Sequence, residues 1–139
     1  MEIKTYHFPP HGDDRGQLVA LEALEDIPFA VKRVYYIYDT LPGVVRGKHA
    51  HRCLEQILVC VHGSCKVALE DGKDRQEILL DDPTLGLYIS NDTWREMYDF
   101  SEGTVLLVLA SEHYDEADYI RDYTKFLEMV QSKGEDHHL

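Results

Sequence analysis

The chain has 139 residues, of which 44% are hydrophobic, and its formal net charge is −12. This length predicts a single domain, spanning 1–139, with enough apolar residues to form a core. The excess of carboxylates argues against nucleic acid or an anionic membrane surface as the main partner, because long-range repulsion would oppose both. An anionic ligand would therefore need a local cluster of arginines.

The apolar runs and the cysteines favour a cytoplasmic protein. The longest apolar run, Val105 to Ala110, is too short to span a bilayer, and no N-terminal stretch combines a basic flank with an apolar run. The three cysteines are odd in number and lack CxxC spacing. Reduced, buried thiols explain them better than disulfides or a zinc site do.

In chain order, short apolar segments alternate with turn signals over the first 112 residues. These segments are 3–8, 16–23, 30–39, 55–73, 76–82, 85–90, 93–100 and 104–111. His62-Gly63-Ser64 and Asp71-Gly72 separate runs rich in β-branched residues, as hairpin turns do. The pattern predicts an all-β fold, a barrel or sandwich covering about 1–112.

The pattern changes after Ser111. Apolar residues then recur at spacings of three and four, which predicts an amphipathic helix over about 115–133. Asp115 is a candidate start and Gly134 a candidate stop, which leaves 134–139 as a tail. We expect the apolar stripe to pack on the barrel, with binding of a partner helix as the alternative.

The stretch RGKHAH contains two histidines, His49 and His51, two residues apart. Alternate residues of a strand project to the same face, so an extended segment would direct both imidazoles into one pocket. Such a pair can bind a metal or transfer protons. Surface histidines or core histidines with satisfied hydrogen bonds are the structural alternative.

The spacing around these histidines resembles the first motif of the cupin superfamily. Gly43 is followed after five residues by His49, then by His51 and Glu55, and Gly63 lies one place beyond the usual final glycine. The resemblance implies a jelly-roll barrel. It also implies that metal-binding members complete their site with a histidine from a second motif.

The matching second segment, 86–95, ends in Arg95 where that histidine would fall. A guanidinium has no lone pair to donate and would repel a cation. We therefore expect no metal and no other cofactor, although a three-ligand site of His49, His51 and Glu55 stays open. Without a metal, the imidazoles suit general acid and base catalysis near neutral pH.

Longer blocks resemble the WxcM-like, FdtA-type sugar 3,4-ketoisomerases. The combination of KRVYYI, RGxHAH, LEQ and DEADYIR is specific, whereas HxH alone is weak. The similar blocks are 13–22, 27–40, 46–67, 86–101 and 108–123. The resemblance implies a homodimer, with exchange of an N-terminal strand such as IKTYHF. It also implies a role in making amino sugars for bacterial surface glycans or antibiotics.

The same resemblance implies the substrate, dTDP-4-dehydro-6-deoxy-D-glucose, whose carbonyl moves from carbon 4 to carbon 3 without a metal. A base removes the acidic proton on carbon 3 to give an enediol, and reprotonation at carbon 4 completes the reaction. The resemblance assigns His49 and His51 as the catalytic pair. We expect His51 to be the carbon base and His49 to shuttle protons among the sugar oxygens.

Other residues are candidates for contacts with the substrate. Tyr36 is a candidate for proton transfer, although a core aromatic is an equal explanation and Tyr35 lies on the opposite strand face. The candidates for binding the diphosphate and sugar are Arg15, Arg33 and Arg46.

Two more candidates lie near the motifs. Glu55 is a candidate for orienting an imidazole, with a buried ion pair as the alternative. Trp94 would pack against the sugar or base, or else plug the barrel. Two further functions remain open, a non-catalytic nucleotide-sugar-binding cupin and a deoxysugar epimerase.

Overall fold

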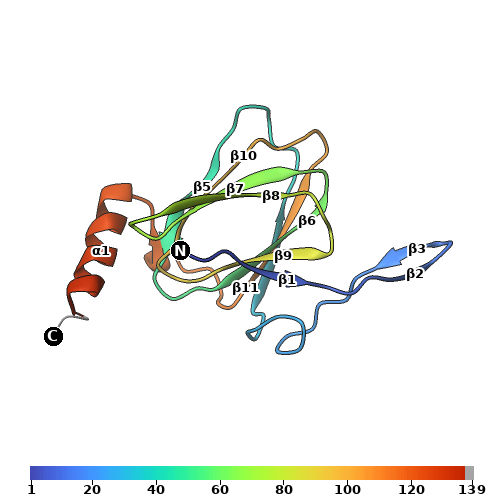
Figure 1. Ribbon diagram of the computed structural model, residues 1–139, viewed down its shortest axis with the longest axis horizontal. Coiled ribbons are helices and arrows are strands. Elements are labelled where there is room, and N and C mark those ends of the chain that lie inside the picture. The colour runs from blue at the N-terminus through green and yellow to red at the C-terminus, as the bar shows by residue number, and fades with distance from the viewer. Residues whose placement is uncertain (137–139) are drawn as a thin grey trace.

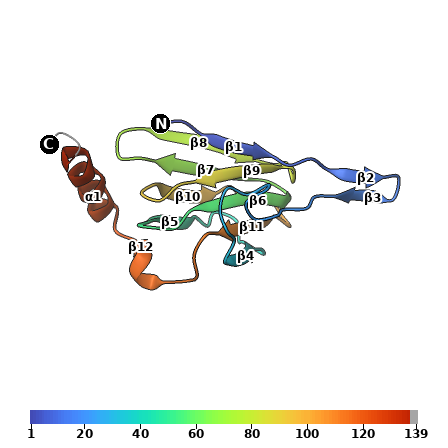
Figure 2. The ribbon, with the colours of Figure 1, turned by 90° about the horizontal axis from the view of Figure 1, so that it is seen from below.

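The computed structural model describes residues 1–136, which form two five-stranded antiparallel sheets. The first sheet contains, in spatial order, β1 (Lys4–His7), β9 (Leu85–Ile89), β6 (Gln56–His62), β11 (Val105–Ala110) and β4 (Arg33–Ile37). The second contains β12 (Tyr119–Ile120), β5 (Arg46–His51), β10 (Trp94–Tyr98), β7 (Cys65–Glu70) and β8 (Arg75–Leu80). Figures 1 and 2 show both sheets in the central body, between the helix and a projecting hairpin.

The core lies between the sheets because each contributes a face of buried apolar side chains. The main cluster joins residues of β6, β7, β9 and β11, including Leu58, Val67, Leu87 and Leu106. β6 begins with five consecutive buried residues, so this central strand is covered on both faces. The all-β prediction is confirmed.

A separate hairpin of β2 (His11–Asp13) and β3 (Gly16–Leu18) projects from the body at the end opposite the helix (Figures 1 and 2). Every residue in its two strands is exposed. β1, which precedes it, pairs with β9 of the same chain from Lys4 opposite Tyr88 to His7 opposite Leu85.

The helix, α1 (Tyr123–Asp136), begins eight residues later than the predicted start. Asp115 does act as a cap, but its side chain accepts from Ala117 in a short 3-10 helix, η1 (Glu116–Asp118). The next two residues then pair with β5, which satisfies their backbone groups at a sheet edge instead of in a helix. The predicted stop was also wrong, because α1 continues through Gly134. The rest of the predicted tail, 137–139, lies outside the described residues.

The apolar side of α1 packs on the second sheet, as predicted. Phe126 is fully buried with Ala50, Trp94 and Ile120, and its ring centroid lies 5.7 Å from that of Trp94. This cluster joins the helix to β5, β10 and β12. No helix within residues 1–136 is long and apolar enough to cross a membrane.

We expect Phe126→Ala to lower the free energy of unfolding by about 3–5 kcal/mol, because it removes a fully buried ring and leaves a cavity. Denaturant unfolding followed by circular dichroism measures the change. Tyr123→Phe is the control, since it removes only an exposed hydrogen bond to Glu70. A loss below about 1 kcal/mol in Phe126→Ala would show that α1 contributes little to stability.

Candidate active site

The two histidines lie on β5 beside a bulge. The register against β10 moves from Arg95 opposite His49 to Glu96 opposite Gly47, so Lys48 is the extra residue. Gly47 and Lys48 both have positive φ angles, 85° and 49°. A bulge re-aims the neighbouring side chain. Beyond it, the rings of His49 and His51 meet edge to face with centroids 4.8 Å apart.

His49 is fixed by the bulge. Its Nδ1 lies 2.7 Å from the carbonyl oxygen of Gly47, and a carbonyl can only accept. Nδ1 therefore carries the hydrogen, which leaves a lone pair on Nε2. Burial, followed by the charge of Arg95, lowers the pKa of His49 to about 4. At neutral pH this side chain is a neutral base.

His51 is fully buried, and its ring contacts Asp118, which lies 67 residues later in the chain. Its Nδ1 lies 2.9 Å from Oδ2 of Asp118, while Oδ1 accepts from the backbone N–H groups of Arg52 and Cys53. Burial, followed by the charge of Arg95, lowers the pKa of His51. The contact is therefore a neutral N–H donating to an ionised acceptor.

A chain of hydrogen bonds connects Arg95 with Tyr35 through Gln56. Arg95 is 1% exposed and donates to the carbonyl oxygen of Thr93 and to Oε1 of Gln56. The Gln56 amide nitrogen then donates to the Tyr35 hydroxyl, 2.9 Å away. Because Tyr35 accepts here, its own proton is free for another acceptor. Burial raises the pKa of Tyr35, so the hydroxyl stays protonated.

A cavity of about 640 Å³ lies beside these groups, between β4, β5 and the segment around β12. Its charged and aromatic lining consists of Arg33, Arg46, Lys48, Arg121, Tyr35, Tyr36, Tyr114, Tyr119 and His49. Its lining within the described part of the chain includes no carboxylate, although the net charge of the whole chain is −12. The cavity is therefore a local site for an anion.

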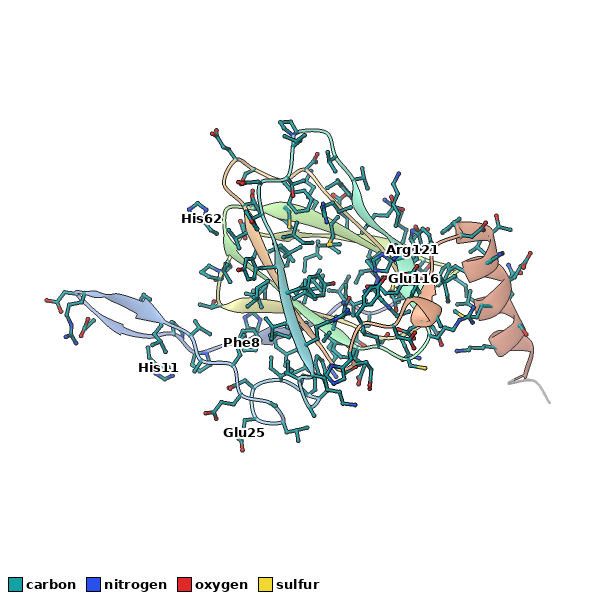
Figure 3. All side chains as sticks on the ribbon, turned by 180° about the vertical axis from the view of Figure 1, so that it is seen from behind. Phe8, His11, Glu25, His62, Glu116 and Arg121 are labelled. Carbon is teal, nitrogen blue, oxygen red and sulfur yellow. The ribbon has the colours of Figure 1, made fainter. Side chains whose placement is uncertain are left out.

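Two of the arginines are held by aromatic rings. The Arg33 guanidinium lies over Tyr35 and Tyr114, and its Nε and Nη2 are buried without a partner among the described residues. Arg121 lies 4.3 Å from the ring centroid of Tyr119 and pairs with Glu116 at 2.8 Å (Figure 3). The unpaired donors of Arg33 are available to a ligand.

The fold brings five of the residues predicted from the sequence to this region. His49, Arg33 and Arg46 line the cavity, with His51 packed behind His49. Tyr36 also lines it, but 62% of the residue is exposed and its ring lies against Tyr38 on the outer side of β4. The inward tyrosine of this strand is Tyr35.

Three other candidates do not line the cavity. Arg15 is at the tip of the β2–β3 hairpin and pairs with Asp13 at 2.6 Å; Figure 3 shows this hairpin far from Arg121. Glu55 accepts from the Tyr88 hydroxyl rather than from a histidine. Trp94 packs against α1 and does not line the cavity.

Sequence reasoning missed Asp118, Tyr119 and Arg121. All three lie in DEADYIR, where the spacing of apolar residues predicts a helix and not a functional site. The ring of Tyr119 lies 4.9 Å from that of His49 and 4.4 Å from that of His51, between centroids. An acidic, an aromatic and a basic residue at the end of a β domain were the available signal.

Comparisons with known proteins agree in family. Residues 1–131 match the family model FdtA, described as WxcM-like, C-terminal. The TDP-4-oxo-6-deoxy-alpha-D-glucose-3,4-oxoisomerase of Aneurinibacillus thermoaerophilus is 53% identical over 130 residues, which cover 94% of each chain.

Solved structures are similar as well. A 3,4-ketoisomerase from Helicobacter canadensis is 52% identical, with a TM-score of 0.91 over 94% of this chain and 98% of that one. A mutant of the 3,4-ketoisomerase QdtA from Thermoanaerobacterium thermosaccharolyticum, solved with TDP-4-keto-6-deoxyglucose, is 45% identical, with a TM-score of 0.92 over 94% of each chain. The barrel, the cationic cavity and these matches together establish that the chain belongs to the FdtA family.

Proposed function

We propose that this chain is a sugar 3,4-ketoisomerase that converts dTDP-4-dehydro-6-deoxy-D-glucose into a dTDP-3-dehydro-6-deoxyhexose. The observation that carries the proposal is a histidine base, His49, in a cationic cavity whose lining contains no carboxylate among residues 1–136. The 53% identity to the Aneurinibacillus oxoisomerase supports the same reaction. We further infer that it acts in the cytoplasm and supplies amino sugars for surface glycans.

The cavity suits a nucleotide sugar in its charge and size. The diphosphate carries two negative charges, which the guanidinium groups of Arg33 and Arg46 would neutralise with geometrically matched N–H donors. Arg33 has two buried donors without a partner among residues 1–136, and a ligand oxygen would satisfy them. The aromatic lining offers faces for the sugar and the base.

The geometry favours His49 as the carbon base and His51 as its support, the reverse of the division expected from the sequence. His49 lines the cavity and has a free lone pair on Nε2, whereas His51 is fully buried behind it. His49 would remove the proton from carbon 3 and leave an enediolate, with the negative charge on oxygen 4. The hydroxyl proton on oxygen 3 then passes to oxygen 4, and return of a proton from His49 to carbon 4 gives the 3-keto sugar.

Tyr35 is the better candidate for an acid that acts on the sugar oxygens. Its hydroxyl accepts from Gln56, so its proton can point to a ligand, and its raised pKa keeps that proton in place. Tyr36 would contact the substrate at the outer wall of the cavity. The proposed reaction is a tautomerisation with no net oxidation, so it requires no redox cofactor, and we propose that it also proceeds without a metal.

Proton NMR of metal-stripped protein with dTDP-4-dehydro-6-deoxy-D-glucose in deuterated water tests the activity. We expect the 4-keto species to be replaced by a 3-keto species. His49→Asn and Tyr35→Phe should each lower kcat by about 10²–10⁴-fold, the range for loss of one acid or base. His62→Asn, which changes an exposed histidine at the far end of the barrel, is the control (Figure 3).

Three results would contradict the proposal. Deuterium at carbon 5 would indicate an epimerase, because a 3,4-ketoisomerase has no reason to exchange that proton. Binding without any spectral change over hours would indicate a binding protein. Activity restored only by added iron or manganese would indicate a metal-dependent enzyme.

The pH dependence of kcat/KM tests the base separately. Because the pKa of His49 is lowered from 6.5 to about 4, its neutral form persists as the pH falls from 7 to 5. We therefore expect kcat/KM to stay level over that range and to fall only near pH 4. Circular dichroism at each pH checks that the protein remains folded. An inflection near pH 6.5 would mean that the base is not a buried histidine.

We also propose a homodimer. β4 is an edge strand. Its outward residues Val34 and Tyr36, and Tyr38 just after its end, are 54–62% exposed. The projecting hairpin exposes Leu18 as well. An exposed apolar face at a sheet edge suits a second copy. Exchange of N-terminal strands would put the partner's copy of β1 at the edge of β9 that β1 occupies in the single chain.

Light scattering at micromolar concentration should give about twice the 16.1 kDa mass of one chain. The double variant Val34→Lys, Tyr38→Lys should shift the mass towards one chain, because two charges would be buried in the interface. Leu79→Lys is the control, since it changes an exposed apolar residue of β8 in the other sheet. A wild-type monomer would contradict the dimer.

A further inference from the structure

Asp118 lies where the segment after the barrel returns to the site, at the junction of η1 and β12. Its carboxylate is 13% exposed, and both of its oxygens are engaged. Oδ2 accepts from Nδ1 of His51, and Oδ1 accepts from the backbone N–H groups of Arg52 and Cys53 at 3.1 and 2.8 Å. The amides prevent the carboxylate from rotating, so its orientation towards the ring is fixed.

We propose that Asp118 is a positioning residue that fixes His51 in one tautomer and, through it, supports the charge that His49 acquires during the reaction. This inference rests on the proposed function. An ionised carboxylate can only accept, so Nδ1 of His51 must carry the hydrogen. Nε2, at the opposite edge of the ring, then carries a lone pair.

The Nε2 atom of His51 is buried and has no hydrogen-bond partner among the described residues. The ring that carries it lies 4.8 Å from the ring of His49 and 4.4 Å from the ring of Tyr119, measured between centroids. A lone pair brings negative partial charge into this space. The other tautomer would bring an N–H, with positive partial charge, into the same space.

The difference matters because His49 becomes an imidazolium when it takes the carbon proton. That cation forms in a buried region next to Arg95. Burial and the charge of Arg95 both oppose it, and they lower the pKa of His49 to about 4. A lone pair on the neighbouring ring, with the carboxylate behind it, stabilises the new charge. An N–H in that position would oppose it.

The variant Asp118→Asn tests the tautomer of His51 with almost no change in the shape of the side chain at position 118. The amide oxygen can still accept from the backbone of Arg52 and Cys53, but its NH₂ group then faces Nδ1 of His51. Two donors cannot face each other, so the ring must move its hydrogen to Nε2. The lone pair and the N–H of His51 exchange places with almost no change in volume.

Nitrogen-15 NMR of the histidine rings in resting protein measures the tautomer without substrate. We expect Nδ1 of His51 to be protonated in the wild type and Nε2 in Asp118→Asn. The variant should lose about 100-fold or more in kcat, by comparison with other wrong-tautomer variants, while its affinity for TDP stays within about twofold. Glu112→Gln is the control, because it removes a nearby carboxylate whose one ion pair within residues 1–136 is with exposed Lys32.

Two results would overturn the inference. One is a hydrogen on Nε2 of His51 in the wild type, which decides the matter even if the variant fails to fold. The other is an inverted tautomer in Asp118→Asn with kcat within about threefold of the wild type. If the wild type binds TDP but does not isomerise the sugar, the proposed function fails, and the support of His49 fails with it. The tautomer result would still decide what Asp118 does to His51.

Discussion

The site depends on one buried cation, the Arg95 guanidinium. It is 1% exposed, and its hydrogen bonds go to neutral acceptors, the Thr93 carbonyl and the Gln56 amide. Its charge is the second largest reason, after burial, why the pKa values of His49 and His51 are lowered. Two imidazoles next to a buried cation that forms no ion pair within residues 1–136 stay neutral, which is the state that a base needs before it acts.

Neutral imidazoles have two tautomers, so the site also needs acceptors that choose between them. The bulge in β5 supplies one by turning the Gly47 carbonyl towards His49. The segment after β11 supplies the other, Asp118, for His51. That segment is held by the pairing of β12 with β5 and by the burial of Phe126 of α1. The C-terminal elements therefore belong to the site as much as the barrel does.

Local patterns in the sequence predicted the parts of the site that depend on neighbouring residues. Alternation along a strand predicted that His49 and His51 share a face. The spacing of the second motif placed Arg95 where a metal-binding histidine would fall, but it did not predict that Arg95 lies beside these histidines. Alternation could not decide between Tyr35 and Tyr36, because that depends on which face of β4 is covered. The contact of Asp118 with His51 joins residues 67 positions apart, and no periodicity relates them.

The error at the start of the helix has the same origin. Asp115 does cap a short helical turn, as its side chain suggests. The residues after that turn, however, form β12 and pair with the edge of β5 instead of continuing a helix. Glu55 is the converse case: its spacing matched a known motif, yet its carboxylate accepts from Tyr88. A motif predicts the backbone position of a residue. The hydrogen-bond partners of its side chain depend on which distant segments pack against it.

The charge distribution shows how an acidic chain can bind an anion. At physiological salt the screening length is about 8 Å, so carboxylates on distant surfaces contribute little inside the cavity. Two carboxylates of the segment that borders it are paired, Glu116 with Arg121 and Asp118 with His51. Within residues 1–136, Nε and Nη2 of Arg33 have no hydrogen-bond partner and are available to an anion. Selectivity for an anionic ligand thus follows from the position of a few charges, although their sum has the opposite sign.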